Sequence, residues 1–142
     1  MLLAGCSALT GEEVGRLAIN KISSEENIIK KDATVTLKQG NEIVIWSDMD
    51  MEYEEEVSIL FRIGISRDGK ALDVIEVDPR QKDMTFGEIK TSIGNKTNWS
   101  FFGRNAVFPI ATDGTYTFEA ILLASENTSL LIKKAELVIK KI

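Results

Sequence analysis

The sequence predicts an all-β protein, built as an antiparallel two-sheet sandwich, on three observations. Apolar residues alternate with polar ones from Asp32 onward, which is the period of strands with one buried face. The pairs Asp68-Gly69 and Asp113-Gly114 separate apolar runs, and such pairs favour tight hairpin turns because both residues tolerate positive φ. About seven to nine short strands at this spacing are typical of a sandwich.

The composition excludes several kinds of chemistry. The chain has 142 residues, which is enough for one domain with a sizeable core. Histidine is absent and Cys6 is the only cysteine. This excludes His-based acid–base catalysis, Ser/His/Asp and Cys/His nucleophiles, zinc sites of Cys and His, and an internal disulfide. A net charge of -5 disfavours nucleic acid as a partner.

The first six residues carry a pattern that ends at Cys6. Leu3-Ala4-Gly5-Cys6 resembles the lipobox of bacterial lipoproteins, in which an aliphatic residue and two small residues precede the cysteine that receives lipid. The resemblance implies that residues 1–5 are the remnant of a signal peptide and that Cys6 is lipidated. Two or three acyl chains would hold the protein firmly, since a single chain binds a bilayer only marginally. Ser7 follows the cysteine, and by the same resemblance this favours the outer membrane.

Residues 10–22 are expected to form a short helix. Thr10 and Glu13 match a capping box. Four apolar residues then recur at helical spacing on one face: Val14, Leu17, Ala18 and Ile22. We expect residues 6–31 to be a lipidated tether that contains this helix, and residues 32–142 to be the β-sandwich domain. A partner-binding amphipathic helix is the alternative reading of the same segment.

Nine segments of the domain have the pattern of strands. They are residues 35–37, 43–46, 57–65, 70–77, 87–93, 99–102, 107–110, 115–124 and 130–142. Pro109 lacks a backbone N–H, so the segment that contains it should lie at a sheet edge. The segment after Asp68-Gly69 should return antiparallel to the one before it.

The clearest strand follows a turn with its own signature. Asp113-Gly114-x-Tyr116-x-Phe118 resembles the turn-to-strand step of immunoglobulin-like domains, where a tyrosine packs the corner. In that resemblance Phe118 takes the position of the cysteine found in antibody domains. It covers six residues and implies an immunoglobulin-like sandwich, with a jelly roll as the alternative.

The most acidic stretch is a candidate calcium site. Asp48, Asp50 and Glu52 would share one side of an extended segment, and hard oxygen ligands suit Ca²⁺. The EF-hand pattern fails, however, because the required glycine and the last glutamate are missing. The alternative is a solvated face whose charge protects a strand edge from aggregation. Paired carboxylates would also suit glycoside hydrolysis, a geometry that sequence alone does not show.

Four aromatic residues could form a platform for sugar rings: Trp46, Trp99, Phe101 and Phe102. Trp46 ends an apolar strand and is expected in the core, because most large aromatic side chains are buried. Trp99 and Phe101 follow the looser stretch around Gly94-Asn95 and are the candidate ligand-binding residues.

These observations predict a non-enzymatic, membrane-anchored lipoprotein that acts as an interaction or accessory module of a bacterial envelope assembly. Its expected partners are the membrane, through the lipid on Cys6, and an envelope protein, and we expect no cofactor. A surface glycan-binding lipoprotein that uses Trp99 is one alternative. A small hydrolase that uses paired carboxylates is the other.

Overall fold

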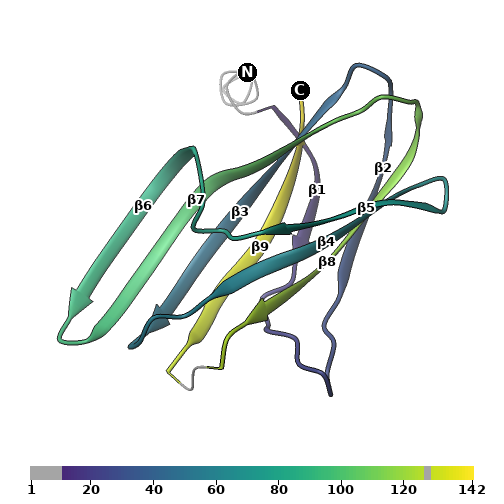
Figure 1. Cartoon of the computed structure of the whole chain (residues 1–142). Helices are drawn as coiled ribbons and strands as arrows, with labels where there is room; N and C mark the ends of the chain where they lie inside the picture. The colour runs from purple at the N-terminus through teal and green to yellow at the C-terminus, as the bar shows by residue number, and fades with distance from the viewer. Residues whose placement is uncertain (1–10, 127–128) are drawn as a thin grey trace.

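The computed structural model describes residues 11–126 and 129–142. Within these ranges the regular structure is entirely β, in two antiparallel sheets that pack face to face as a sandwich (Figure 1). The predicted all-β sandwich is therefore confirmed. Among the described residues there is no helix of the length and hydrophobicity needed to cross a membrane.

One sheet has five strands and the other has four. The five-stranded sheet has the order β1-β9-β3-β7-β6, with β1 at Glu12–Ala18, β9 at Leu131–Lys141, β3 at Glu42–Tyr53, β7 at Lys96–Pro109 and β6 at Met84–Ile93. The four-stranded sheet has the order β2-β8-β4-β5, with β2 at Lys31–Leu37, β8 at Gly114–Ala124, β4 at Ile59–Arg67 and β5 at Lys70–Val77. Below, the inner face of a sheet is the one turned to the other sheet.

The strand pairs are nested along the chain. β1 pairs with β9, β2 with β8, β3 with β7 and β4 with β5, so that early strands meet late ones. Successive nested pairs lie in alternate sheets, and β1 and β9, the first and last strands of the described residues, are neighbours. β6 is added outside this scheme as a hairpin partner of β7.

The main core lies between the sheets and comes from alternate residues of each strand. In β4 the inner residues are Ile59, Phe61, Ile63 and Ile65, and in β8 they are Tyr116, Phe118, Ala120 and Leu122; all are buried. Both faces agree with the alternation predicted from the sequence. Full burial of each large apolar side chain contributes roughly 1.5–3 kcal/mol, which makes this alternation the main determinant of register.

The tight turn predicted at Asp68-Gly69 is confirmed. Asp68 has φ 49° and Gly69 has φ 83°, which are the positive values that a type I′ turn requires at both central positions. β4 and β5 pair directly across it, with Arg67 opposite Lys70. The returning strand has the predicted bounds, Lys70–Val77.

The helix predicted over residues 10–22 is wrong. Glu12–Ala18 form β1 and pair with β9, with Leu17 opposite Leu137, and Leu17 is only 1% exposed. Pairing satisfies the backbone of both strands, and this outweighs a helical pattern already weakened by glycines. A Cβ at Gly11 would lie 2.8 Å from the carbonyl oxygen of Lys141, so the close approach of the two chain ends requires glycine there. The segment expected to be part of a tether thus supplies a strand.

Two other segments are longer than the sequence indicated. The strand expected at residues 43–46 continues through the acidic stretch to Tyr53, because Met49 and Met51 point inward while the carboxylates between them point outward. The segments 99–102 and 107–110 form one strand, β7, with a bulge at Asn105. β7 as a whole lies between β3 and β6 and is not an edge strand, but beyond Arg104 it pairs with β3 alone. The predicted edge therefore holds only locally: Pro109 is the last residue of β7, a position where a missing N–H costs no ladder bond.

The β6–β7 hairpin extends beyond the four-stranded sheet. In Figure 1 it projects to the lower left, past β4 and β5. It turns through Gly94-Asn95, with Ile93 opposite Lys96 and Gly94 at φ 63°. The overhang leaves both faces of β6 without a covering sheet.

Candidate functional site

The residue predicted to carry lipid, Cys6, lies outside the described residues. Its lipidation stays a prediction. The other sequence-predicted site residues all belong to the five-stranded sheet, on β3 and β7.

The predicted calcium ligands lie in a row on the outer face of β3. Asp48 is 2.8 Å from Lys134 Nζ and 3.4 Å from Arg16, and Glu52 is 3.6 Å from Lys96 Nζ. Asp50 lies between Asp48 and Glu52, opposite Lys134 on β9. Within residues 11–126 and 129–142, no cluster of three or more Asp, Glu, His or Cys side chains suits a metal ion. The row therefore has the character of cross-strand ion pairing on a solvated face.

Arg16 connects three strands in the half of this outer face that carries the charged side chains of β1, β9 and β3. Its guanidinium bonds to carboxylates of Glu13 on β1, Glu136 on β9 and Asp48 on β3. The hydrogen bond with Glu13 is the main cause that raises the pKa of Arg16 above its ordinary value. A single exposed ion pair contributes little to the free energy of unfolding. The Arg16 guanidinium, however, is shared by carboxylates on three strands and so helps to order all three.

The other half of the outer face is apolar and holds a small core of its own. Trp46 is 1% exposed although it faces away from the main core, and it packs with Val44 and Val138. Its ring stacks on Phe102 at 4.7 Å and on Phe86 of β6 at 5.9 Å between centroids. Trp46 Nε1 is buried without a hydrogen-bond partner in the structure. The expected burial of Trp46 is correct, but a separate cluster buries it.

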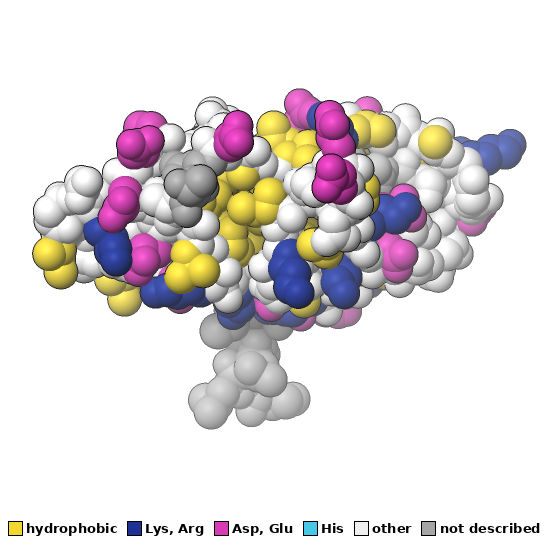
Figure 2. Space-filling model, turned by 90° about the horizontal axis from the view of Figure 1, so that it is seen from below, with side chains coloured by type: hydrophobic (Ala, Val, Ile, Leu, Met, Phe, Trp, Pro, Cys, Tyr) yellow, Lys and Arg dark blue, Asp and Glu magenta, His cyan; other side chains and the backbone are white. Residues whose placement is uncertain are grey.

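The outer face of β6 continues this apolar surface into solvent. Register with β7 places four apolar side chains of β6 on that face, and we call them the overhang strip: Met84, Phe86, Ile89 and Ile93. Ile93 is 80% exposed, Ile89 63% and Phe86 44%. Seen from below, the end of the molecule formed by this hairpin shows hydrophobic side chains beside charged ones (Figure 2). Large exposed apolar side chains grouped on one strand are uncommon on a monomer's surface.

The candidate ligand-binding residues Trp99 and Phe101 lie on the opposite, inner face of β7. Phe101 is buried and Trp99 is half-buried at the margin of the core, with ring centroids 5.3 Å apart. The indole Nε1–H donates to Glu88 Oε2 at 2.8 Å. This hydrogen bond is the main cause that lowers the pKa of Glu88.

Two lysines complete the Trp99 cluster. Lys90 Nζ lies 4.1 Å from the centre of the Trp99 ring, and Lys82 Nζ lies 4.9 Å from that of Phe101. Lys82 also pairs with Glu88 at 3.0 Å. Its stem crosses Gly103, where a Cβ would be 2.5 Å from Lys82 Cδ. The cluster thus combines an indole held in a fixed orientation with two ammonium groups, a combination suited to a sugar that carries negative charge.

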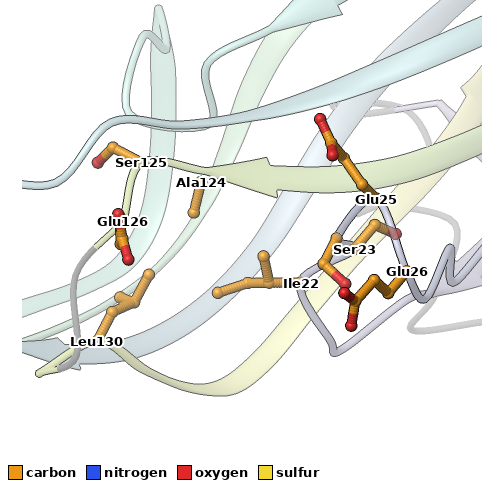
Figure 3. A pocket seen from close by; sticks show the side chains of 9 residues that line it. Ile22, Ser23, Glu25, Glu26, Ala124, Ser125, Glu126 and Leu130 are labelled. Atoms are coloured by element: carbon orange, nitrogen blue, oxygen red, sulfur yellow. The ribbon is translucent and has the colours of Figure 1, made fainter.

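A cavity of about 770 Å³ opens at one end of the sandwich and is lined in part by acidic residues. Figure 3 shows Glu126 on one side, and Glu25 and Glu26 on the other, with Ile22 between them. All three carboxylates are exposed to solvent. A glycosidase keeps its catalytic acid protonated by burying it in apolar surroundings, whereas these three side chains are exposed.

Sequence reasoning missed Phe86, Glu88 and Lys82. The alternation in β6 shifts by one residue at the bulge between Phe86 and Ile89, so that a strict period of two does not align the overhang strip. If one extra residue is allowed at Gly87, whose φ is 60°, the four apolar residues fall on one face and the overhang strip becomes visible in the sequence.

The chain matches no protein-family model and no curated protein sequence.

Proposed function

We propose that this chain is a non-enzymatic lipoprotein of a bacterial envelope whose sandwich is a protein-interaction module. The observation that supports this best is the overhang strip. It is an exposed apolar row on a projecting hairpin, next to the ion-paired half of the same sheet. Apolar surface rimmed by charge marks protein-binding sites, so we infer that an envelope protein covers the strip.

The proposed anchor would hold the sandwich close to the membrane. β1 begins at Glu12, so the chain between Cys6 and the sheet can reach at most about 20 Å. In Figure 1 β1 begins at the top of the sandwich, whereas the β6–β7 turn lies at the lower left. A lipid on Cys6, at the outer membrane as the resemblance favours, would therefore place the turn end of the β6–β7 hairpin away from the bilayer and accessible to a partner.

Intact mass of the protein purified from its native host tests the anchor. The proposal predicts a mature chain that begins at Cys6 and carries the added mass of two or three acyl chains. A chain that retains residues 1–5 with an unmodified Cys6 would contradict it.

The topology we infer is a jelly roll. The nested pairs β1–β9, β2–β8, β3–β7 and β4–β5, divided between two sheets, support it over an immunoglobulin-like arrangement. The corner signature has a local basis: buried Tyr116 donates a hydrogen bond to the carbonyl of Thr112 at 2.6 Å. That contact supports a packed corner in either topology.

A second candidate function is glycan binding at the Trp99 cluster. It is supported by the half-buried indole on the uncovered inner face of the hairpin, with Lys90 and Lys82 beside it. Calorimetric titration with neutral and uronic-acid oligosaccharides tests it. Saturable binding should be lost in Trp99→Ala and retained in Trp46→Phe, whose ring lies on the outer face. If none of the saccharides in the panel gives a heat of binding, this candidate function is removed.

A further inference from the structure

We propose that the free edge of β6 pairs with the same edge of a second copy of this chain, which joins two five-stranded sheets into one. The inference rests on the proposed interaction module and names one partner for its hairpin. β6 is the last strand of its sheet, so one side of its backbone is open to pairing. Unpaired edges present a row of N–H and C=O groups to another strand.

The hairpin register shows which backbone groups are open. The two-residue turn closes at Ile93 and Lys96, a pair that exchanges both hydrogen bonds in a tight hairpin. Hydrogen-bonded and non-hydrogen-bonded pairs then alternate along an antiparallel ladder. Ile89, Thr91 and Ile93 therefore direct their backbone groups to β7. Lys90 and Ser92 direct theirs to the free edge.

Charge selects one register for two identical antiparallel edges. A two-fold axis at Lys90 would oppose two ammonium groups, and like charges directly opposite are destabilising. An axis at Thr91 would set Lys90 against the neutral Ser92 of the other copy. An axis at Ile89 sets Lys90 against the carboxylate of Glu88 of the other copy, twice by symmetry. With the two-fold axis at Ile89, the charges along one β6 edge therefore complement those of the same edge in the other copy.

The same register covers exposed apolar surface. Ile89, 63% exposed, would face its own counterpart on the outer face, and the two overhang strips would become neighbours. The bulge at Gly87, with φ 60°, bends the strand and ends the regular ladder. An isologous contact of this kind uses each β6 edge once, so that pairing through it stops at a dimer.

Sedimentation equilibrium of the full chain, with Ile89→Lys and Val74→Lys, tests the proposal. Val74 is 62% exposed and lies on β5, the edge strand of the other sheet, which makes it a matched control. We expect a dimer for the wild type and for Val74→Lys, and a monomer for Ile89→Lys whose unfolding midpoint equals that of the wild type at concentrations too low for the dimer to form. A wild type that is monomeric at every concentration would overturn the proposal.

A disulfide tests the register. In the Cys6→Ser background, Ile89→Cys should form a covalent dimer on mild oxidation, since opposed residues of a non-hydrogen-bonded pair lie about 4.5 Å apart at Cα. Thr91→Cys, which would face Gly87 of the other copy, should form no covalent dimer. The reverse outcome would contradict the axis at Ile89. A monomeric wild type whose hairpin still captures a different envelope protein would refute self-pairing and leave the interaction module intact.

Discussion

Trp46 and Phe102 lie ring on ring across β3 and β7, with centroids 4.7 Å and planes 6° apart. Phe86 of β6 adds a second stack on the same indole at 5.9 Å. These three rings join the projecting hairpin to the centre of the sheet on a face that the main core does not reach. We infer that this outer cluster positions the overhang strip.

Trp46→Ala should lower the free energy of unfolding more than Trp46→Phe does. We expect Trp46→Ala to lower the free energy of unfolding by about 3–5 kcal/mol. Trp46→Phe should cost less, because it keeps one ring in the stack and Nε1 has no hydrogen-bond partner to lose. Urea unfolding followed by circular dichroism measures both. Equal losses for the two variants would contradict the account.

Asn105 should be the polar anchor of the loop before β6. Its Oδ1 accepts from buried Ser47 Oγ at 2.7 Å, and its Nδ2 donates to carbonyls of Pro79 and Gln81. Asn105→Ala leaves the buried Ser47 hydroxyl and the Pro79 carbonyl without this partner, so we expect a loss of about 2–4 kcal/mol in the free energy of unfolding, measured with urea. Asn98→Ala, on the outer face of the same strand, is the control and should cost within about 0.5 kcal/mol. The absence of coupling between Ser47→Ala and Asn105→Ala in a double-mutant cycle would argue against this role.

The tyrosine corner should contribute one hydrogen bond. Tyr116→Phe removes the donor to the Thr112 carbonyl, and we expect the free energy of unfolding to fall by about 0.5–1.5 kcal/mol. Thr112→Ala keeps that carbonyl and should leave stability within about 0.5 kcal/mol. Thermal or urea unfolding checks both, and a Tyr116→Phe variant as stable as the wild type would remove the hydrogen bond from the account.

Acid should release the Trp99 indole from Glu88. The hydrogen bond from Trp99 lowers the pKa of Glu88 from its ordinary 4.5, so the interaction is present in full above pH 4.5. It is lost as pH falls through the lower, folded-state value. The indole N–H signal of Trp99, assigned in Trp46→Phe, should titrate with a midpoint below 4.5 by NMR. In Glu88→Gln the signal should stay constant over that range, and a midpoint at or above 4.5 in the wild type would be contrary to the account.

Local signals predicted the parts of the fold that depend on local contacts. The Asp68-Gly69 turn and the alternation in residues 57–65 and 115–124 follow from neighbouring residues, and the structure confirms them. The nested pairing depends on strands far apart in the chain, which no local period encodes. The N-terminal strand was missed for the same reason, because its partner β9 lies at the other end of the sequence.

The candidate site was predictable only in part. Trp99 and Phe101 were singled out from the sequence, and they do lie together. Their partners Lys82 and Glu88, and the overhang strip, belong to a stretch whose bulge breaks the alternation. One unpaired residue exchanges the two faces of a strand, so a strict period assigns the wrong side chains to solvent.

The most direct test of the central claim is site-specific photo-crosslinking in the native host. A photoreactive phenylalanine analogue at Ile93 on the overhang strip is compared with one at Val74 on the other sheet. The account predicts a discrete crosslinked species from position 93 and none from position 74. No crosslink at 93, or the same products from both positions, would contradict an interaction module centred on the β6–β7 hairpin.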